Sequence, residues 1–293
     1  GCEDVEVDGL DVYTCREPRT YNGDGIDVDC CRNVRIRNCK VNTDDDSITL
    51  RANGGRLRHR PDVCEDIVIE NCTLSSICNG LRLGVGTGTV RKATVRNCRV
   101  VGSRFAVCLV CGYRKEQCGT AIEDVRFENL EVEAEKFLVA YHRFTEGHTF
   151  RNIVFDGVKG RTQGDSRIYA DNRWPFENFT FRNVFIPEGF DAINVRDLAV
   201  EGGDFPRREM TPARAQELNN GFLKNICHLL GIRNNLYIIL WNLIFFLISC
   251  HLFISEFRLA TSYLIKEFIG NRNRNQIRIG EITIVHRVFL AAH

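Results

Sequence analysis

The chain has almost no net charge and no recognisable leader sequence. Its 39 Lys and Arg residues against 38 Asp and Glu give a formal net charge of +1. The basic excess that marks nucleic-acid-binding proteins is therefore absent, and we expect no nucleic-acid partner. The sequence starts at Gly1, inside a repeat and without a signal peptide, so we expect further repeat units to precede it. With 44% hydrophobic and 26% charged residues, the composition is that of a globular protein.

The near-zero charge conceals two unlike parts. Residues 207–293 hold eleven Lys and Arg against five Glu and no Asp, whereas residues 1–206 hold 28 basic and 33 acidic residues. We therefore predict a folded domain over 1–206 and an atypical hydrophobic and basic tail over 207–293.

An internal repeat dominates residues 1–206. Eight segments share the order apolar, two polar, apolar, polar, apolar, polar, Asn or Gly, apolar, as in CRNVRIRNCKV from Cys31 and CEDIVIENCTL from Cys64. The alternation predicts a half-buried strand in each unit, and such a strand buries its apolar face by stacking on the next unit. The Asn or Gly recurs every 19 to 33 residues, at Gly9, Asn38, Asn71, Asn97, Asn129, Gly157, Asn183 and Gly202.

A second strand is expected in each unit, at GIDVD (25–29), SITLRA (47–52), GLRLG (80–84), FAVCLV (105–110) and FLVAY (137–141). Leucine-rich repeats would place Leu at fixed positions, and β-propellers would show about 40 residues and four strands per unit. Neither pattern fits. The repeat predicts an all-β domain, a right-handed single-stranded parallel β-helix. Asn at the bends would tolerate left-handed backbone and bond to the Asn of the next coil.

Fourteen cysteines do not form a zinc pattern, because no CxxC is matched by a second CxxC or a His pair. Cysteine alternates with Leu, Val, Ile and Phe at equivalent repeat positions, which is typical of buried free thiols. Neighbouring coils would lie about 4.8 Å apart, farther than the Cβ separation of about 3.8 Å in a relaxed disulfide. We expect two interior columns, Cys2, Cys31 and Cys64, and Cys39, Cys72 and Cys98. A disulfide stays open among Cys108, Cys111 and Cys118.

Aspartates gather where the second strands begin. The alignment puts Asp24, Asp46 and Asn79 at one position in successive coils, with Asp45 beside them. Clustered carboxylates repel and push their pKa values apart, which suits an acid and a base in catalysis. A calcium site or a solvated Asp-rich turn is the alternative.

Residues 21–50, YNGDGIDVDCCRNVRIRNCKVNTDDDSITL, resemble the core of glycoside hydrolase family 28, the polygalacturonase and rhamnogalacturonase-type β-helices. That family has Asn-Thr-Asp-Gly followed about twenty residues later by Gly-Asp-Asp. Asn22–Gly25 matches the first motif with Gly23 in place of Thr, and Asp44–Asp46 matches the second with Asp44 in place of Gly. The resemblance covers roughly residues 1–205.

The resemblance implies a role for each of three aspartates. Asp45 would be the general acid that protonates the glycosidic oxygen, and Asp24 and Asp46 would activate water on the opposite face. Such inverting hydrolysis needs carboxyl groups about 6.5–9.5 Å apart. The resemblance also implies a pectin-type or related polysaccharide as substrate, no cofactor or metal, and an extracellular or periplasmic location.

Two family motifs are missing. Gly-His-Gly should fall near residues 77–80, where the chain has no His, and Arg-Ile-Lys should fall where it reads Val107–Val110. Divergent members with Ser-x-Cys-Asn and a basic residue on the strand are more similar, which makes Asn79 and Arg82 candidate substrate-binding residues. Arg82 should face outward above Thr49, either in the groove or paired with Asp27 or another carboxylate. Further substrate-binding candidates are Asn22, His59, His142 and Arg143.

In the tail, residues 236–254 are nineteen residues without Lys, Arg, Asp or Glu, long enough for a membrane span. Membrane contact, helices packed on the coils, and sequence not selected to fold with the domain all remain open. For the domain, the sequence favours a glycoside hydrolase. A non-catalytic glycan-binding β-helix and a polysaccharide lyase are the alternatives.

Overall fold

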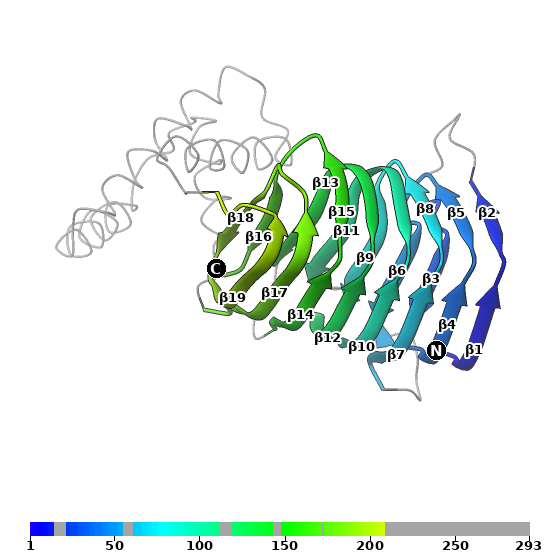
Figure 1. The fold of residues 1–293 in the computed structure, drawn as a ribbon. Helices are drawn as coiled ribbons and strands as arrows, with labels where there is room; N and C mark the ends of the chain where they lie inside the picture. Colours follow the sequence, from blue (N-terminus) through cyan, green and yellow to red (C-terminus); the bar gives the residue numbers. More distant parts are fainter. Residues whose placement is uncertain (15–21, 55–60, 112–118, 143–147, 172, 209–293) are drawn as a thin grey trace, which may run out of the picture. The chain divides into compact units, whose positions relative to one another are not determined.

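The computed structural model describes residues 1–14, 22–54, 61–111, 119–142, 148–171 and 173–208. These residues form 19 strands, and every strand pairing among them is parallel. The strands stack into the coils of a right-handed parallel β-helix (Figure 1). The fold class predicted from the repeat is confirmed.

The predicted first strand of each unit forms one continuous sheet. Its members pair in chain order, each with the equivalent strand of the next coil. They are β1 (Glu3–Asp8), β4 (Arg32–Arg37), β7 (Val63–Glu70), β10 (Thr89–Arg96), β12 (Ala121–Glu128), β14 (Phe150–Asp156), β17 (Phe176–Phe185) and β19 (Val195–Asp204).

Four coils contain one more strand than the sequence predicted. A short strand follows the Asn or Gly bend directly, in β2 (Asp11–Tyr13), β5 (Lys40–Thr43), β8 (Thr73–Ser76) and β15 (Lys159–Thr162). Runs of three or four residues carry too little alternation to be recognised in a sequence. The predicted second strands are found as β3 (Ile26–Asp29), β6 (Ile48–Ala52) and β9 (Asn79–Gly86), and within β11 (Arg99–Cys111) and β13 (Glu131–His142), which each join a short strand to a second strand. The equivalent strands β16 (Ser166–Tyr169) and β18 (Phe190–Ile193) were not predicted.

The bends after the first sheet have left-handed backbone. Asn38, Asn71 and Asn97 have φ between 53° and 56°, and Gly157 has φ 70°. The side chains bond between coils, with Asn71 Nδ2 donating to Asn38 Oδ1 at 3.4 Å. This confirms the role predicted for the asparagines.

A second left-handed position, not predicted, recurs within the first sheet. It is occupied by Asp4, Asn33, Asp66, Lys92, Asp124, Asn152, Asn178 and Asp197, with φ between 51° and 58°. Asp and Asn tolerate this conformation better than other non-glycine residues. Lys92 is the one residue of this set that is neither Asp nor Asn. Its side chain cannot make the local hydrogen bonds that ease this conformation, so its backbone is strained.

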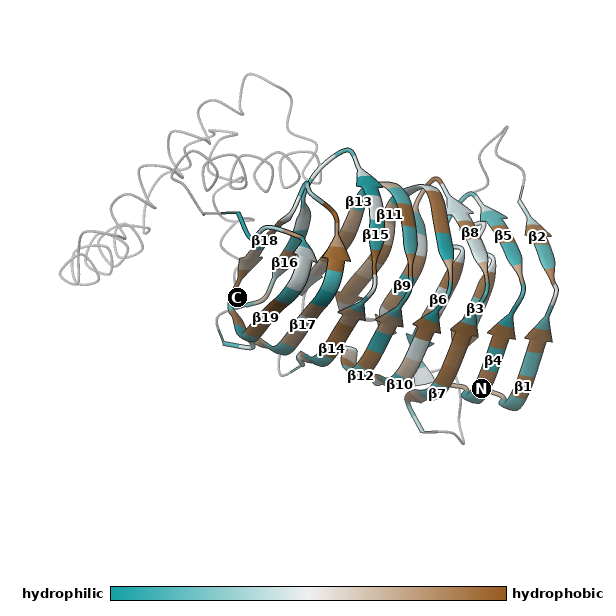
Figure 2. Cartoon of the chain, in the orientation of Figure 1, coloured by the Kyte–Doolittle hydropathy of each residue, from teal (hydrophilic) through white to brown (hydrophobic). Residues whose placement is uncertain are grey.

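Figure 2 shows hydrophobic and hydrophilic stretches along the strands, and the buried apolar residues of successive coils form one core. Cys2, which was expected in an interior column, is exposed. Cys39, Cys72 and Cys98 are at most 2% exposed and are free thiols, as predicted. Farther along, the core turns aromatic: the rings of Phe127 and Phe155 stack with centroids 4.5 Å apart.

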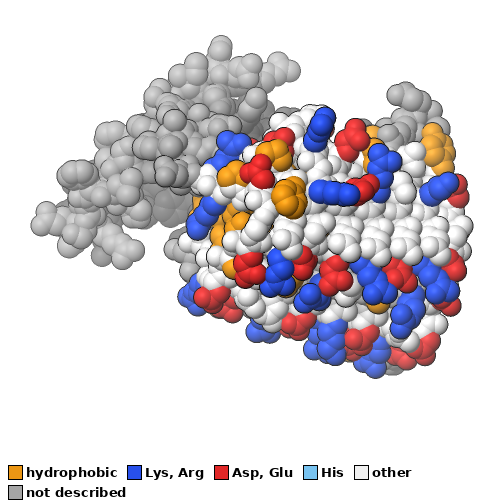
Figure 3. Space-filling model, in the orientation of Figure 1, with side chains coloured by type: hydrophobic (Ala, Val, Ile, Leu, Met, Phe, Trp, Pro, Cys, Tyr) orange, Lys and Arg blue, Asp and Glu red, His pale blue; other side chains and the backbone are white. Residues whose placement is uncertain are grey.

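The described surface carries both charge signs side by side (Figure 3). Ion pairs join neighbouring coils, such as Arg96 with Glu70 at 2.6 Å and Arg91 with Glu65 at 2.8 Å.

The described coils reach Arg208, two residues beyond the expected end of the domain at residue 206. Phe205 is buried, and Arg208 donates its backbone N–H to Phe190 O at 2.8 Å. Residues 209–293, including 236–254, lie outside the described residues, so the predictions for the tail stay predictions. Within the described ranges, no helix is long and apolar enough to cross a membrane.

Candidate active site

The strand register brings the acidic positions together where the second strands β3, β6 and β9 begin. Gly25 donates its N–H to Asp46 O at 2.9 Å, and Ser47 donates to Asn79 O at 2.9 Å. Asp24, Asp46 and Asn79 therefore occupy one position in three successive coils, as the sequence alignment predicted.

The residue after each acidic position is small for a steric reason. A Cβ at Gly25 would lie 2.4 Å from Ser47 O and from Val41 Cγ1, and one at Gly80 would lie 2.4 Å from Val100 Cγ1. At these two positions an added Cβ would force its neighbours to move, and the equivalent position in the coil between them holds the small, buried Ser47. The Asp-Gly and Asn-Gly pairs of the sequence thus fix where the polar side chains emerge.

Asp46 is 2% exposed and forms an ion pair. Its Oδ2 lies 3.1 Å from Arg82 Nη1, and its Oδ1 accepts a hydrogen bond from Asn79 Nδ2. Burial raises the pKa of Asp46, and the Arg82 cation and the Asn79 amide act against that rise.

Arg82 lies next to Thr49 in the register, as predicted, and its partner is a neighbouring carboxylate. Asp27, the other partner considered, pairs instead with Arg51 at 2.6 Å.

Asp24 is partly exposed and carries a strongly perturbed pKa. Burial raises the pKa of Asp24 to about 7, and the negative charges of Asp27, Asp46 and Asp45 add to the rise. A carboxyl group of this kind exchanges its proton near neutral pH.

Asp45 is held through its backbone, which leaves its side chain for other contacts. Its carbonyl accepts bonds from Thr43 Oγ1 at 2.7 Å and from Ser76 Oγ, and its N–H donates to Gly23 O at 3.2 Å. The side chain is partly exposed, whereas the preceding Asp44 is fully buried.

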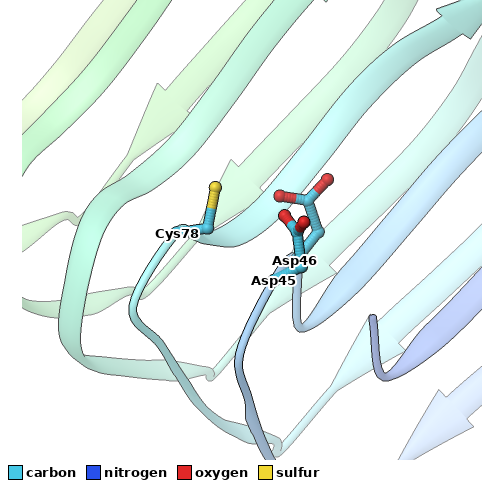
Figure 4. Close-up of side chains that lie close together, drawn as sticks. All are labelled: Asp45, Asp46 and Cys78. Atoms are coloured by element: carbon cyan, nitrogen blue, oxygen red, sulfur yellow. The ribbon is translucent and has the colours of Figure 1, made fainter. Parts of the chain in front are cut away.

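The Asp45 and Asp46 carboxyl groups lie beside the thiol of Cys78, with one ligand atom of each within 4.8 Å of the others (Figure 4). Such a group could in principle hold a cation. However, Ca²⁺ and Mg²⁺ favour oxygen ligands, and burial together with the charges of Asp46 and Asp45 raises the pKa of the Cys78 thiol. Arg82 already supplies the positive charge to Asp46, so we assign no metal here.

The residues at the missing basic motif are buried. Val107, Cys108, Leu109 and Val110 are at most 4% exposed. A cation close to this motif is Arg104, which was not predicted because it precedes the expected position. Arg104 is exposed, and its guanidinium carbon lies 5.1 Å from the ring centroid of Phe105.

Arg104 occupies the position equivalent to Asp45, two coils further along the axis. Phe105 donates its N–H to Cys78 O at 3.1 Å and pairs in register with Asn79. The charges of Arg82, Asp46 and Arg104 all act on the pKa of Cys108, which burial raises. Among the described residues, no carboxylate forms an ion pair with Arg104.

The remaining candidates are only partly described. Asn22 is exposed, with φ 54°, two residues before Asp24. His59 and Arg143 lie outside the described residues, and His142 ends β13 with its side chain outside the description. Their predicted roles stay predictions.

Two surface grooves lie elsewhere. One follows the asparagine bends from Asn71 to Asn183, and the other is lined by segments 132–135 and 160–163. The aspartates combine a buried charge with open carboxyl groups, and we therefore take them as the candidate active site.

The chain matches a known protein family. The family model described as glycosyl hydrolases family 28 matches residues 1–201. No curated protein matches the chain.

Two solved structures are similar in fold. A Yersinia enterocolitica family 28 exopolygalacturonase has a TM-score of 0.53 and 16% identity, over 70% of this chain and 43% of that chain. The catalytic unit of a GH87 alpha-1,3-glucanase from Streptomyces thermodiastaticus has a TM-score of 0.39 and 17% identity, over 70% and 44%, too low to support an argument. The chain thus spans less than half the length of the chains it matches.

Proposed function

The chain belongs to glycosyl hydrolase family 28, and from this membership we propose that it hydrolyses glycosidic bonds in a pectin-type or related polysaccharide. The observation that carries the proposal is the gathering of Asp24, Asp45 and Asp46 at one edge of the coil. Two of these carboxyl groups are partly exposed and one is buried.

In the proposed reaction, water attacks the anomeric carbon while the bond from that carbon to the glycosidic oxygen breaks. Asp45 gives its proton to the departing oxygen, and Asp24, supported by Asp46, takes the proton from the attacking water. Attack from the face opposite to the leaving group inverts the anomeric configuration. The raised pKa of Asp24 supports an acid–base role for the cluster.

The positive charge of Arg104 would suit a sugar that carries a carboxylate group. Arg104 is exposed and has no carboxylate partner among the described residues, and guanidinium groups bind carboxylates through paired, charge-assisted hydrogen bonds. The similar Yersinia protein is an exopolygalacturonase, which is compatible with an acidic substrate. Arg104 would then provide the positive charge that the Arg-Ile-Lys motif, missing from this chain, provides in the family.

The non-catalytic glycan-binding alternative has one observation in its favour. Asp46 is already bound by Arg82 and Asn79. Of the three aspartates, only Asp24 and Asp45 therefore offer a carboxyl group to a substrate. The lyase alternative requires a basic proton abstractor and typically calcium, and no contact at the site favours it.

A panel of acidic and neutral polysaccharides incubated with the full chain distinguishes these functions. New reducing ends without an ultraviolet-absorbing unsaturated product support the hydrolase. Both signals together would identify a lyase. Binding by affinity electrophoresis without either signal would replace the proposal with a glycan-binding function. Proton NMR of the first product reads its anomeric configuration, and retention would contradict the proposed mechanism.

A further inference from the structure

Asp46 differs from the other two aspartates in its surroundings. Its side chain is 3% exposed, and that of its partner Arg82 is 14% exposed. Both carboxyl oxygens are engaged, Oδ2 by Arg82 Nη1 at 3.1 Å and Oδ1 by the Asn79 amide.

The Asn79 amide is itself fixed. Besides the bond to Asp46, Nδ2 contacts Cys78 Sγ at 3.3 Å, and the side chain is buried. Arg82 and Asn79 both come from β9, so one rigid strand of the next coil sets the position of the Asp46 carboxylate.

Asp46 also influences its neighbours electrostatically. Its charge contributes to the raised pKa of Asp24 and of the Cys78 thiol. The titratable side chains that interact electrostatically with Asp46 are Asp24, Asp45, Cys78, Arg82 and Cys108. Asp27 and Arg51 act in turn on Asp24, and Arg104 acts on Cys108.

We propose that Arg82 and Asn79 are positioning residues that hold Asp46 as a buried anion, and that Asp46 acts on Asp24 and Asp45 through its charge instead of contacting the attacking water. This inference rests on the proposed hydrolase function. It narrows the reacting carboxyl groups to Asp24 and Asp45, and it moves Arg82 from substrate binding to support of the aspartates.

The physical reason lies in access and charge. A general base must lie within hydrogen-bond reach of the water that it activates. Asp46 is almost closed to solvent and has both oxygens occupied, whereas Asp24 and Asp45 are partly open. A fixed negative charge in a poorly solvated position acts strongly on neighbouring titrations. Removal of the Arg82 cation leaves Asp46 buried without its counter-charge, which favours its neutral form.

The test is the pH dependence of kcat and KM in Arg82→Met, with Arg82→Lys as the conservative variant. Once Asp46 is neutral in Arg82→Met, Asp24 loses one of its repelling charges, so the limb of the pH profile that Asp24 controls moves to lower pH. We also expect kcat to fall by about 10- to 100-fold with KM nearly unchanged. Arg82→Lys should restore the position of that limb.

Arg91→Met is the matched control, because it removes an arginine from the buried Glu65 at 2.8 Å on a strand away from the site. It should leave the pH profile and kcat unchanged even if it lowers stability. Circular dichroism checks that each variant folds.

Two results would overturn the inference. An Arg82→Met enzyme that loses affinity for substrate but keeps its kcat and pH profile makes Arg82 a substrate-binding residue. Carboxyl NMR titration, which needs no activity, gives the second: an unchanged Asp24 titration in Arg82→Met excludes the electrostatic link. A wild-type chain inactive on every polysaccharide instead refutes the proposed function, while this titration still tests the link.

Discussion

The carboxylate of Asp46 and the guanidinium of Arg82 meet across neighbouring coils, 3.1 Å apart between Oδ2 and Nη1, where both are shielded from solvent. A buried ion pair is weak evidence for stability, because well-packed apolar residues often replace one at no cost. We therefore attribute its presence, at the edge where Asp24 and Asp45 emerge, to the proposed positioning role.

Replacing Asp45 by Asn should remove the proton donor while keeping the fold. The hydrogen bonds that hold this turn use the backbone of Asp45, and Asn preserves them. We expect kcat on the best substrate to fall by about 10²–10⁴-fold. Asp66→Asn, at an exposed position on β7, serves as the control. Unchanged hydrolysis in Asp45→Asn would make the acidic cluster a structural turn.

The activity should switch on as the pH rises through about 7, the pKa of Asp24. Asp24 must be ionised to accept a proton from water, and below that pH it is neutral. A profile of kcat/KM between about pH 5 and 9 checks the direction. A loss of activity as the pH rises through the same value would mean that Asp24 donates the proton, and the roles of Asp24 and Asp45 would be exchanged.

Asp24→Asn should stabilise the folded chain at alkaline pH. The pKa of Asp24 rises from 3.8 to about 7 on folding, so between these values the folded state holds a proton that the unfolded state has lost. Stability therefore falls as the pH rises through this window. Thermal unfolding should show a higher Tm for Asp24→Asn at pH above about 7 and none of this gain below about pH 4. An equal gain at both pH values would contradict the electrostatic cause.

Arg104→Ala should weaken binding of acidic polysaccharides alone. A hydrogen bond to a charged group contributes about 1.5–3 kcal/mol, so we expect KM for a polyuronate to rise by about tenfold or more. Binding of neutral glycans should not change. Arg99→Ala, an exposed arginine on the same strand, is the matched control. Equal effects of the two substitutions would show a general charge effect.

Lys92→Asn should raise stability. Lys92 has φ 52° at the position where seven other coils have Asp or Asn, and left-handed backbone costs other residues about 1–2 kcal/mol. We expect a gain of about 1 kcal/mol and a Tm increase of about 2–4 °C. Lys92→Val should lower Tm, because a β-branched side chain disfavours this backbone. A similar Tm for Asn and Val would exclude the backbone explanation.

The stacking of coils was predictable because one register sets many positions at once. Once Cys39, Cys72 and Cys98 occupy equivalent positions, the inward columns and the juxtaposition of Asp24 with Asp46 follow. The second left-handed position was not predicted, since it lies inside a strand pattern where its polar residues read as ordinary outward side chains.

The contacts of the site were less accessible to sequence reasoning. Alternation showed that Arg82 points outward but not which carboxylate it meets, because Asp27 and Asp46 are both within one or two coils. Arg104 was not predicted because it lies before the position at which the family motif is expected. The local signal was available: a cation followed by an aromatic residue at the start of a strand next to the acidic positions.

Because of the bend residues, the number of coils can change without moving the three aspartates. Each coil turns on its own Asn or Gly, such as Asn129 or Gly157, without help from distant coils. A whole coil inserted after β13 would lengthen the sheet beyond Arg104 by about 4.8 Å and leave Asp24, Asp45 and Asp46 in place. Insertion of single coils would therefore lengthen the surface beyond Arg104 without moving the three aspartates.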